Sequence, residues 1–328
     1  MYQQDRKAQT ILRIIGELQK RGFASRSALA TALSLYTSTV SIRMKELLDW
    51  GIIREVGRGE SGSSGGRKAT LVELDPGYGS FGGIYLAHDR VTASLFTPGL
   101  QESDRRTLSL AGMGEADVLA ELAEVARWLG SASSTIPLRG IGFAASSVVS
   151  GGGRVGSSSH FPWNLGEVPG LLADQAHCSL ICSDNDANAA ALADASLLDS
   201  ERPNLLHLLV YGNVPTIGSG IFLDGRLYRG SEGGAGELDE GLWPLEGDIA
   251  LQVLRLGRLL GRFLDVDAIF ISGVLDEEAK RRLERSGDAE APKGSVRFVD
   301  DPCWVEKGAA LMALHEHIEI ITGVKHEG

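Results

Sequence analysis

The sequence is poor in cysteine and contains no long apolar run. Its 328 residues include three cysteines, Cys178, Cys182 and Cys303, too few for a disulfide framework. Cys178 and Cys182 flank an apolar stretch, where free cysteine behaves as a small hydrophobic residue. No apolar run approaches the roughly eighteen residues of a membrane span, and the first ten residues lack the apolar segment of a signal peptide. We therefore expect a cytoplasmic protein with no membrane partner.

Net charge is divided unevenly along the chain. Hydrophobic residues at 43% and charged residues at 23% are ordinary for a soluble globular protein, and the length suggests two or three domains. Residues 1–74 contain 12 Lys and Arg against 7 Asp and Glu, a net charge of +5, which leaves −16 for the rest of a chain whose total is −11. A basic front end on an acidic body predicts a nucleic-acid-binding module joined to a body that does not itself touch DNA.

The first 50 residues have the pattern of three helices. Apolar residues recur at helical spacing over Arg6–Arg21, and Gly22 is placed to end that helix. Ser25 can cap a second, short helix over Arg26–Leu33 by accepting hydrogen bonds from the free amides of its first turn. A third helix is predicted from about Thr37 to about Trp50.

The short turn between the second and third predicted helices is typical of a helix-turn-helix. We expect the third helix to bury an apolar stripe and to enter the DNA major groove with its other side. Small hydroxyl side chains near its start would let the backbone approach the groove, and basic side chains can contact guanine edges or phosphates. The DNA-contacting residues predicted on this helix are Ser38, Thr39, Ser41, Arg43 and Lys45.

A strand, a loop and a second strand are predicted after the helices. Residues 52–56 are predicted to be a strand, 57–68 a loop rich in glycine and serine, and 69–74 the return strand. With the three helices before them, they predict a winged helix. Glycines remove steric bulk, and arginine favours the negative potential of a narrow minor groove. The predicted wing contacts to DNA are Arg58, Arg67 and Lys68. A helical bundle with a solvated linker is the alternative, which the order of elements and the charge disfavour.

One stretch in the second half of the chain is unusually rich in glycine. Residues 216–240 hold seven glycines, several times the usual share. Ile217–Leu223 is predicted to be a strand, Asp224-Gly225 a tight turn and Arg226–Arg229 a return strand. We interpret residues 230–236 as a loop whose backbone approaches a ligand.

These motifs resemble those of the ROK family, named for repressors, open reading frames and sugar kinases. The resemblance is carried by D-G-R-L-Y-R-G at 224–230, G-A-G-E-L at 234–238, D-N-D-A-N-A-A-A-L-A-D at 184–194, and the wing residues G-R-G-E-S at 57–61. It implies an N-terminal winged helix-turn-helix, mostly α with a β wing, over residues 1–74. A linker over 75–80 and an α/β actin-like (ribonuclease H-like) ROK body of two lobes over 81–328 would follow.

The same resemblance indicates that kinase chemistry has been lost. Family kinases carry a magnesium-binding carboxylate and a glycine turn for phosphate where this sequence has Tyr85 and Ala87-His88-Asp89. Val214-Pro215-Thr216 replaces a further phosphate-contacting Gly-Thr-Gly. Glu240 stands in place of the family's zinc-binding histidine, and no cysteine lies between Cys182 and Cys303 to supply thiolate ligands. We therefore expect no enzyme activity, no catalytic residue, no cofactor and no metal site.

Four residues are candidates for binding an effector: Asn185, Asp186, Glu237 and His160. In the family's kinases, the aspartate of this motif is the general base for the sugar hydroxyl, and the asparagine beside it holds the sugar. The resemblance carries these positions over to Asp186 and Asn185. His160 stands in a sugar-contacting loop where the family usually has Asn. The alternative is structural, because Asn and Asp at the start of an alanine-rich helix also satisfy its free amides.

The charge division and the resemblance both predict a DNA-binding transcriptional regulator. The leading hypothesis is a repressor of carbohydrate-related genes that binds a palindromic operator as a homodimer or higher homo-oligomer and responds to a sugar or sugar derivative. An alternative is a regulator whose body is only a scaffold for dimerisation or a protein partner. A sugar kinase is a third interpretation, which fits the fold but lacks three phosphate-binding elements.

Overall fold

The computed structural model describes the chain in twelve segments. They are residues 2–58, 69–132, 135–147, 149–150, 154–156, 161, 163–200, 202–211, 217–238, 249–275, 277–281 and 295–324. None of the helices in these segments combines the length and the apolar character needed to span a membrane.

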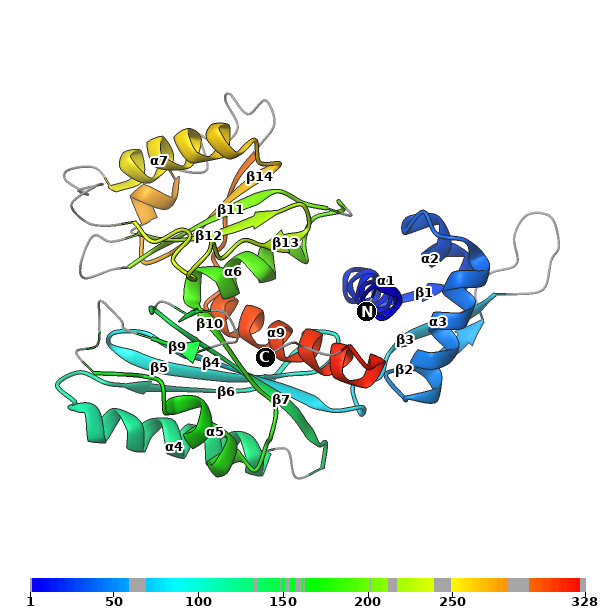
Figure 1. The fold of residues 1–328 in the computed structure, drawn as a ribbon, viewed down its shortest axis with the longest axis horizontal. Helices are drawn as coiled ribbons and strands as arrows, with labels where there is room; N and C mark the ends of the chain where they lie inside the picture. Colours follow the sequence, from blue (N-terminus) through cyan, green and yellow to red (C-terminus); the bar gives the residue numbers. More distant parts are fainter. Residues whose placement is uncertain are drawn as a thin grey trace.

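The N-terminal module is a winged helix-turn-helix (Figure 1). Its elements are α1 (Tyr2–Arg21), β1 (Phe23–Ser25), α2 (Arg26–Ala32), α3 (Thr37–Asp49), β2 (Ile53–Arg58) and β3 (Thr70–Leu74). The short strand β1, which was not predicted, pairs with β3 and gives an antiparallel sheet in the order β1-β3-β2. The predicted cap is confirmed, since the Ala28 amide donates to Ser25 Oγ at 3.2 Å.

The body contains two sheets of the same topology. The first lobe contributes β4 (Ser80–Leu86), β5 (Arg90–Phe96), β6 (Glu102–Ser109), β7 (Leu138–Ala145) and β10 (Ile181–Asn185), in the order β10-β7-β4-β5-β6. The second contributes β11 (Leu205–Val210), β12 (Ile217–Leu223), β13 (Arg226–Leu227), β14 (Ala268–Gly273) and β15 (Ser295–Phe298), in the order β13-β12-β11-β14-β15. In each sheet the strand that comes first in the chain is central. The next two strands follow on one side of it, each antiparallel to its neighbour, and the last two lie on the other side and run parallel to it. This repeated topology confirms the predicted two-lobed α/β body.

Helices cover the outer faces of the two sheets and fill the space between them. Helices α4 (Glu115–Ala132) and α5 (Val168–Ala176) lie over the first sheet, and α7 (Ile249–Leu264) lies over the second (Figure 1). Helices α6 (Asp186–Ala195) and α9 (Trp304–Thr322) lie between the lobes. A small ribbon, β8 (Val149–Ser150) with β9 (Arg154–Val155), lies near the end of β10.

Glycines allow α9 to pack directly on its neighbours. A Cβ added at Gly83 of β4 would lie 1.9 Å from the Glu306 carbonyl oxygen, and one at Gly308 would lie 1.8 Å from the Ala189 carbonyl oxygen of α6. Since real Cβ contacts are never this short, only glycine allows the layers to approach so closely. The position of α9 between the two lobes, beside the region of contact between them that we call the cleft, therefore depends on these missing side chains.

The N-terminal module is docked on the body through α1. A single apolar cluster joins residues of α1, such as Ile11 and Leu18, to Leu314 and Ile318 of α9. The Lys20 ammonium donates to the Leu198 carbonyl oxygen just beyond α6, and the Gln19 amide donates to the Pro98 carbonyl oxygen at 2.8 Å. The two modules therefore share one apolar core.

Candidate nucleic-acid interface and effector cleft

Helix α3 presents a polar side to solvent. It buries Val40, Met44 and Leu47 against the rest of the module, and the side chains of Ser38 and Lys45 are exposed. Ile42 lies between them on the outward face and is 55% exposed. Thr39 and Ser41 lie on the flanks of that face and are half-buried. The outward face of α3 is therefore available to a groove of DNA along most of the helix.

Arg43 forms an ion pair with a residue of its own helix. Its Nη1 atom donates to Glu46 Oε2 at 2.6 Å, and Glu46 Oε1 is also 3.0 Å from the Lys7 ammonium of α1. The Arg43 side chain is 23% exposed, so it lies along the edge of α3 toward α1. A contact between Arg43 and DNA stays a prediction.

Tyr36 was missed by the sequence analysis. It occupies the N-cap position of α3 with an extended backbone, and its side chain is 84% exposed. A residue that normally caps a helix has a small hydrogen-bonding side chain, so an exposed aromatic ring at this position was a usable signal. Arg58 ends β2, while Arg67 and Lys68 lie outside the described residues, so the predicted wing contacts stay predictions.

Asn185 lies at the junction of β10 and α6 and connects the two lobes. Its Oδ1 atom accepts hydrogen bonds from the amides of Ala187 at 2.8 Å and Asn188 at 3.4 Å, which is the capping role considered from the sequence. Its Nδ2 atom donates to Glu237 Oε1 at 3.1 Å and to the Ser147 carbonyl oxygen at 3.3 Å. Because Glu237 belongs to the second lobe and Ser147 to the first, Asn185 spans the cleft.

Asp186 is fully buried at the same junction. Its Oδ1 atom accepts a hydrogen bond from the Tyr211 hydroxyl at 2.7 Å, and the Tyr85 hydroxyl also faces the carboxyl group. Oδ2 has no hydrogen-bond partner of good geometry within the described segments. Burial raises the pKa of Asp186 to about 6, since the charged form loses its hydration, although the two hydroxyls partly offset this. Asp186 is therefore a carboxyl group enclosed by two tyrosines.

A second polar link across the cleft joins Arg229 to Asp184. The guanidinium donates to Asp184 Oδ2 from Nε at 2.9 Å and from Nη2 at 2.5 Å. The Asp184 side chain is fully buried, and its Oδ1 atom accepts from the Asn188 side chain at 2.8 Å. The Arg229 side chain is 44% exposed, so it can return to water, whereas removing it would leave the buried Asp184 charge without a partner, which is costly. This link lies within two quoted motifs, but the sequence analysis did not pair them.

Glu237 completes the cleft, and His160 is not placed. Glu237 is exposed as a residue, yet neighbouring atoms enclose its carboxyl group enough that burial raises its pKa. His160 lies outside the described residues. The structure therefore brings three of the four predicted effector residues together. Among the described residues, no three His, Cys, Asp or Glu side chains lie close enough to hold a metal ion.

Two glycines of the glycine-rich stretch allow close packing of the backbone against neighbouring segments. A Cβ at Gly220 would lie 2.2 Å from the Ala187 carbonyl oxygen of α6, and one at Gly236 would lie 2.0 Å from the Ser219 carbonyl oxygen. In contrast, a Cβ at Gly234 would meet nothing within 4 Å. At Gly236 the missing side chain lets the backbone approach β12, and the interpretation of 230–236 as a ligand-approaching loop stays a prediction.

A buried polar network holds the other end of α6. Asp194 accepts from the Trp304 indole nitrogen of α9 at 2.8 Å and lies 2.5 Å from His207 Nδ1, while His207 Nε2 lies 2.8 Å from Ser272 Oγ. The order of contacts is that of a serine hydrolase triad, but Ser272 is only 4% exposed and no substrate could reach it. The network instead fastens α6, β11, β14 and α9 to one another.

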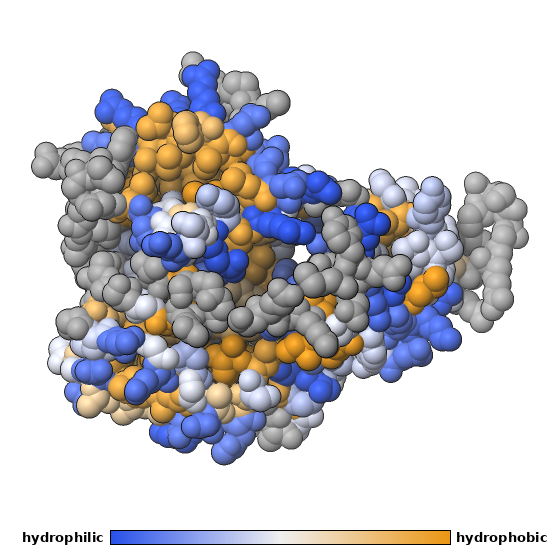
Figure 2. All heavy atoms as spheres, in the orientation of Figure 1, coloured by the Kyte–Doolittle hydropathy of each residue, from blue (hydrophilic) through white to orange (hydrophobic). Residues whose placement is uncertain are grey.

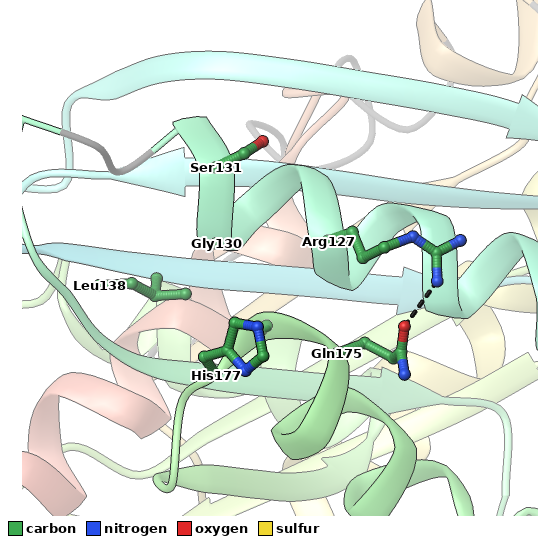
Figure 3. Close-up of a pocket in the computed structure, with 7 residues that line it drawn as sticks. Arg127, Gly130, Ser131, Leu138, Gln175 and His177 are labelled. Atoms are coloured by element: carbon green, nitrogen blue, oxygen red, sulfur yellow. Dashed lines mark hydrogen bonds between the residues drawn. The ribbon is translucent and has the colours of Figure 1, made fainter.

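A surface pocket lies on the first lobe, away from Asn185 and Asp186. It is an open hollow between α4 and the end of α5, lined by Arg127, Ser131, Leu138, Gln175 and His177 among others. Figure 3 shows the Arg127 guanidinium donating to Gln175 across its rim, at 2.5 Å. Of the predicted DNA-binding and effector residues that the structure describes, none lines it.

Comparison with known proteins supports both modules. The family described as winged helix-turn-helix DNA-binding matches residues 8–54. The chain is 26% identical over 235 residues to a xylose repressor of Staphylococcus xylosus, covering 70% of this chain and 59% of the relative. It is 23% identical over 231 residues to a xylose repressor of Bacillus spizizenii, covering 69% and 58%. The chain thus spans less than two thirds of the length of these relatives.

Among solved structures, a ROK family transcriptional regulator described as a homologue of the E. coli MLC protein is similar with a TM-score of 0.67. The identity is 18%, and the match covers 96% of this chain and 98% of that one. The chain has the fold of a ROK family transcriptional regulator. A ROK glucokinase from Streptomyces griseus, solved with glucose and AMPPNP, matches with a TM-score of 0.54 and 15% identity over 72% of this chain and 99% of its own. The ROK resemblance is therefore confirmed at the level of the fold.

Within the ROK fold, the first strand of the body departs from the kinase pattern in a way that the structure makes concrete. Tyr85, which stands where the family's kinases carry a carboxylate, is 8% exposed and directs its hydroxyl at Asp186. Its ring lies in an apolar cluster with Ala144 and Trp304. A bulky phenol next to the buried carboxyl group leaves this part of the cleft without the small residues that phosphate binding requires.

Proposed function

We propose that this protein is a DNA-binding transcriptional repressor of carbohydrate-related genes whose kinase-like body senses a sugar. The observation that carries the proposal is the exposed outward face of α3, with Ser38 and Lys45, in a winged helix module fused to a ROK body. The similarity to xylose repressors supports the same conclusion. The boundaries predicted above, 1–74 for the DNA-binding domain and 81–328 for the effector body, remain part of the proposal, as does a cytoplasmic location.

DNA binding would follow the geometry of winged helix dimers. Two copies of α3 enter successive major grooves of a palindromic operator, which matches the two-fold symmetry of a homodimer. Lys45 contacts phosphate or a guanine edge, and Ser38 permits close approach at the start of the helix. Tyr36, exposed one residue before α3, adds an aromatic contact to a sugar or phosphate of the backbone.

The body would bind a ligand without phosphorylating it. A general base must reach the hydroxyl it deprotonates, yet Asp186 is buried and accepts a hydrogen bond from Tyr211. The protein group that a ligand can reach is the carboxylate of the exposed Glu237, an acceptor for sugar hydroxyls; the buried Asn185 amide would become available to the ligand once its bond to Glu237 opens. We therefore propose no catalytic residue and no cofactor.

A ligand would act through contacts that already span the cleft. Its hydroxyls compete with Asn185 for Glu237, and so change how the two lobes are held. The start of α6 lies at this site, Asp194 near its other end is fastened to Trp304 of α9, and the Leu198 carbonyl oxygen beyond it accepts from Lys20 of α1. A shift of α6 can thus pass to the DNA-binding module, provided that the ligand binds one lobe arrangement better than the other.

A second candidate function is a regulator with no small-molecule ligand. It is favoured by the satisfied contacts of the cleft, where Asn185 is bonded to Glu237 and Ser147, and Arg229 to Asp184. In that case, the cleft residues stabilise a closed scaffold for dimerisation or a protein partner. Thermal unfolding of the full chain against sugars, with xylose first, separates the two functions. A ligand at a hundredfold its Kd stabilises by about 2.7 kcal/mol, and loss of that effect in Glu237→Ala places it in the cleft.

The DNA-binding proposal is tested with operator fragments selected from random DNA by the full-length protein. Lys45→Ala should weaken specific binding about tenfold or more, because one phosphate or base contact contributes about 1–3 kcal/mol. Arg226→Ala, an exposed cation on the body, is the matched control and should leave the affinity unchanged. Selection of no sequence at all, or equal loss in both variants, would overturn the proposal.

A further inference from the structure

Ile42 lies at the centre of the outward face of α3. Four exposed residues follow one another along this face at the spacing of one side of a helix: Ser38, Ile42, Lys45 and Asp49. Three of them are polar, whereas Ile42 is apolar and 55% exposed. Figure 2 shows apolar surface between hydrophilic atoms over the position that α3 occupies in Figure 1. A single exposed apolar residue is common on protein surfaces, but this one lies in the middle of the face that would enter the major groove.

The other side chains of this face leave few that can reach the base edges. Ser38 is short, and Arg43 lies on the edge of α3 toward α1. Asp49 is the last residue of the helix, and phosphate would repel its negative charge, so the first turns of α3 are the part that fits the groove. The long exposed side chains of that part are Ile42 and Lys45. Since Lys45 contacts phosphate or a guanine edge, Ile42 is the residue that faces the remaining base edges.

The chemistry of the isoleucine side chain restricts the base that it can favour. Isoleucine has neither a donor nor an acceptor in its side chain, so it cannot hydrogen-bond to a base edge. Thymine is the base that carries an apolar group in the major groove, its C5-methyl group, and apolar side chains contact that group. The other three bases would place donors or acceptors against Ile42, and these would lose their water without gaining a partner.

We propose that Ile42 reads one base pair in each half of the operator by packing on the C5-methyl group of a thymine. This inference rests on the proposed function, because it requires α3 in the major groove. Two-fold symmetry repeats the contact, so the two thymines occupy symmetry-related positions. Burial of one methyl group changes affinity about fourfold, so the two contacts together contribute about fifteenfold.

The test uses an operator selected from random DNA by the full-length protein. Each thymine of a half-site, together with its symmetry mate, is replaced by deoxyuridine, which forms the same base pair but lacks the methyl group. For the wild type, this replacement should weaken binding about fifteenfold at one pair of positions. Ile42→Ser should bind the thymine operator more weakly and show no loss at that pair. Because Ile42 is exposed, the variant should fold, which circular dichroism checks.

Three further variants separate Ile42 from other sources of the effect. Ile320→Ser makes the same change at a residue that is 52% exposed on α9, and it should keep the full effect of deoxyuridine. Tyr36→Ser should also keep it, although the Tyr36 ring is 84% exposed directly before α3. Selection from random DNA repeated with Ile42→Gln should replace the thymine at the sensitive position, because glutamine favours adenine.

Four results would overturn the assignment to Ile42. They are a selected operator with no thymine in its half-site, a wild type that binds deyoxyuridine and thymine operators equally, a deoxyuridine effect that persists in Ile42→Ser, and a thymine retained in the selection with Ile42→Gln. In each of these cases the protein still selects an operator, so the proposed function stands. Selection of no sequence at all contradicts the proposed function itself, and the assignment to Ile42 fails with it.

Discussion

At the scale of single residues, burial decides what the carboxylates of the cleft can do. Asp184 and Asp186 lie two positions apart and both are buried. Asp184 is paired with Arg229, whereas Asp186 accepts hydrogen bonds from hydroxyls and a backbone amide and lies near the Glu237 carboxylate. The charge of the Asp184 carboxylate is therefore balanced by a neighbouring cation. The surroundings of Asp186 instead favour its protonated form more than water does.

Replacing Asp186 with Asn should stabilise the protein at neutral pH. The folded-state pKa of about 6 lies above the ordinary value of 3.8, so the folded chain binds the proton more tightly than the unfolded chain. Wild-type stability that depends on this proton is present below about pH 4 and is lost as pH rises toward 6. Asp186→Asn lacks this loss and can still accept from Tyr211. Its advantage in unfolding free energy should grow from near zero at pH 4 to about 1–3 kcal/mol at pH 7.

Chemical unfolding at several pH values measures this difference. The exposed Asp174, changed to Asn, is the matched control and should show no such trend. A variant of Asp186 that is less stable than wild type at pH 7, or a difference that does not change with pH, would contradict the assignment.

At the scale of elements, the layers of the body are held at backbone contact. Gly83 and Gly142 of the first sheet face the carbonyl oxygens of α9, and Gly308 faces α6. These glycines belong to different motifs, and their common role is visible only when α9 is in place. Each of these glycines is compatible with its own strand or helix, so the local sequence gives no sign of this shared role.

Gly308→Ala should destabilise the protein strongly. The new methyl group would lie 1.8 Å from a backbone oxygen of α6, which cannot move without shifting the helix, so a loss of about 2–4 kcal/mol in unfolding free energy is expected. Gly170→Ala in α5 is the matched control, because nothing lies within 4 Å of its added Cβ and alanine favours a helix. Chemical unfolding that found the two variants equally stable would refute the packing argument.

At the scale of the whole molecule, the joint between the modules is built from both of them. The predicted linker contains Tyr78, whose hydroxyl lies 2.5 Å from His317 Nε2 on α9. Arg139 lies over the Tyr78 ring and donates to its carbonyl oxygen. Together with α1, these contacts hold the DNA-binding module in one position on the body, so that the orientation of α3 depends on α9.

The joint should weaken in acid because of His317. Burial, with a smaller contribution from Arg139, lowers its pKa from 6.5 to about 4, so the folded state favours the neutral ring. The stability that this ring contributes is present above about pH 6.5 and is lost as pH falls toward 4. His317→Gln keeps an acceptor for Tyr78 but does not titrate. It should lose less stability than wild type between pH 7 and pH 5, by about 1–2 kcal/mol.

Thermal and chemical unfolding of the full chain provide the comparison. His177→Gln, on the exposed end of α5, controls for the loss of a histidine. If wild type and His317→Gln lost the same unfolding free energy on acidification, the ring would be free to become charged in the folded state. In that case, the Tyr78 contact would not fix the joint.

The order of the elements was largely predictable, and the cleft was predictable only in part. Local patterns predicted the cap at Ser25, the helix α3 and the position of Asn185 at the start of an alanine-rich helix. They did not predict the link between Asp184 and Arg229, because it depends on the distance between two segments that the chain alone does not fix. The ion pair of Arg43 with Glu46, three residues along α3, and the aromatic Tyr36 before that helix had local signals that were not used.

The sequence by itself determined the class of each module, since charge, helical periodicity and glycine placement act over short stretches of chain. It also supplied the motifs that resemble the ROK family. Only the tertiary structure decided which glycines serve packing and which carboxylates are compensated. Burial and charge compensation are properties of neighbours in space, and the closing helix α9 supplies those neighbours from the last 25 residues of the chain.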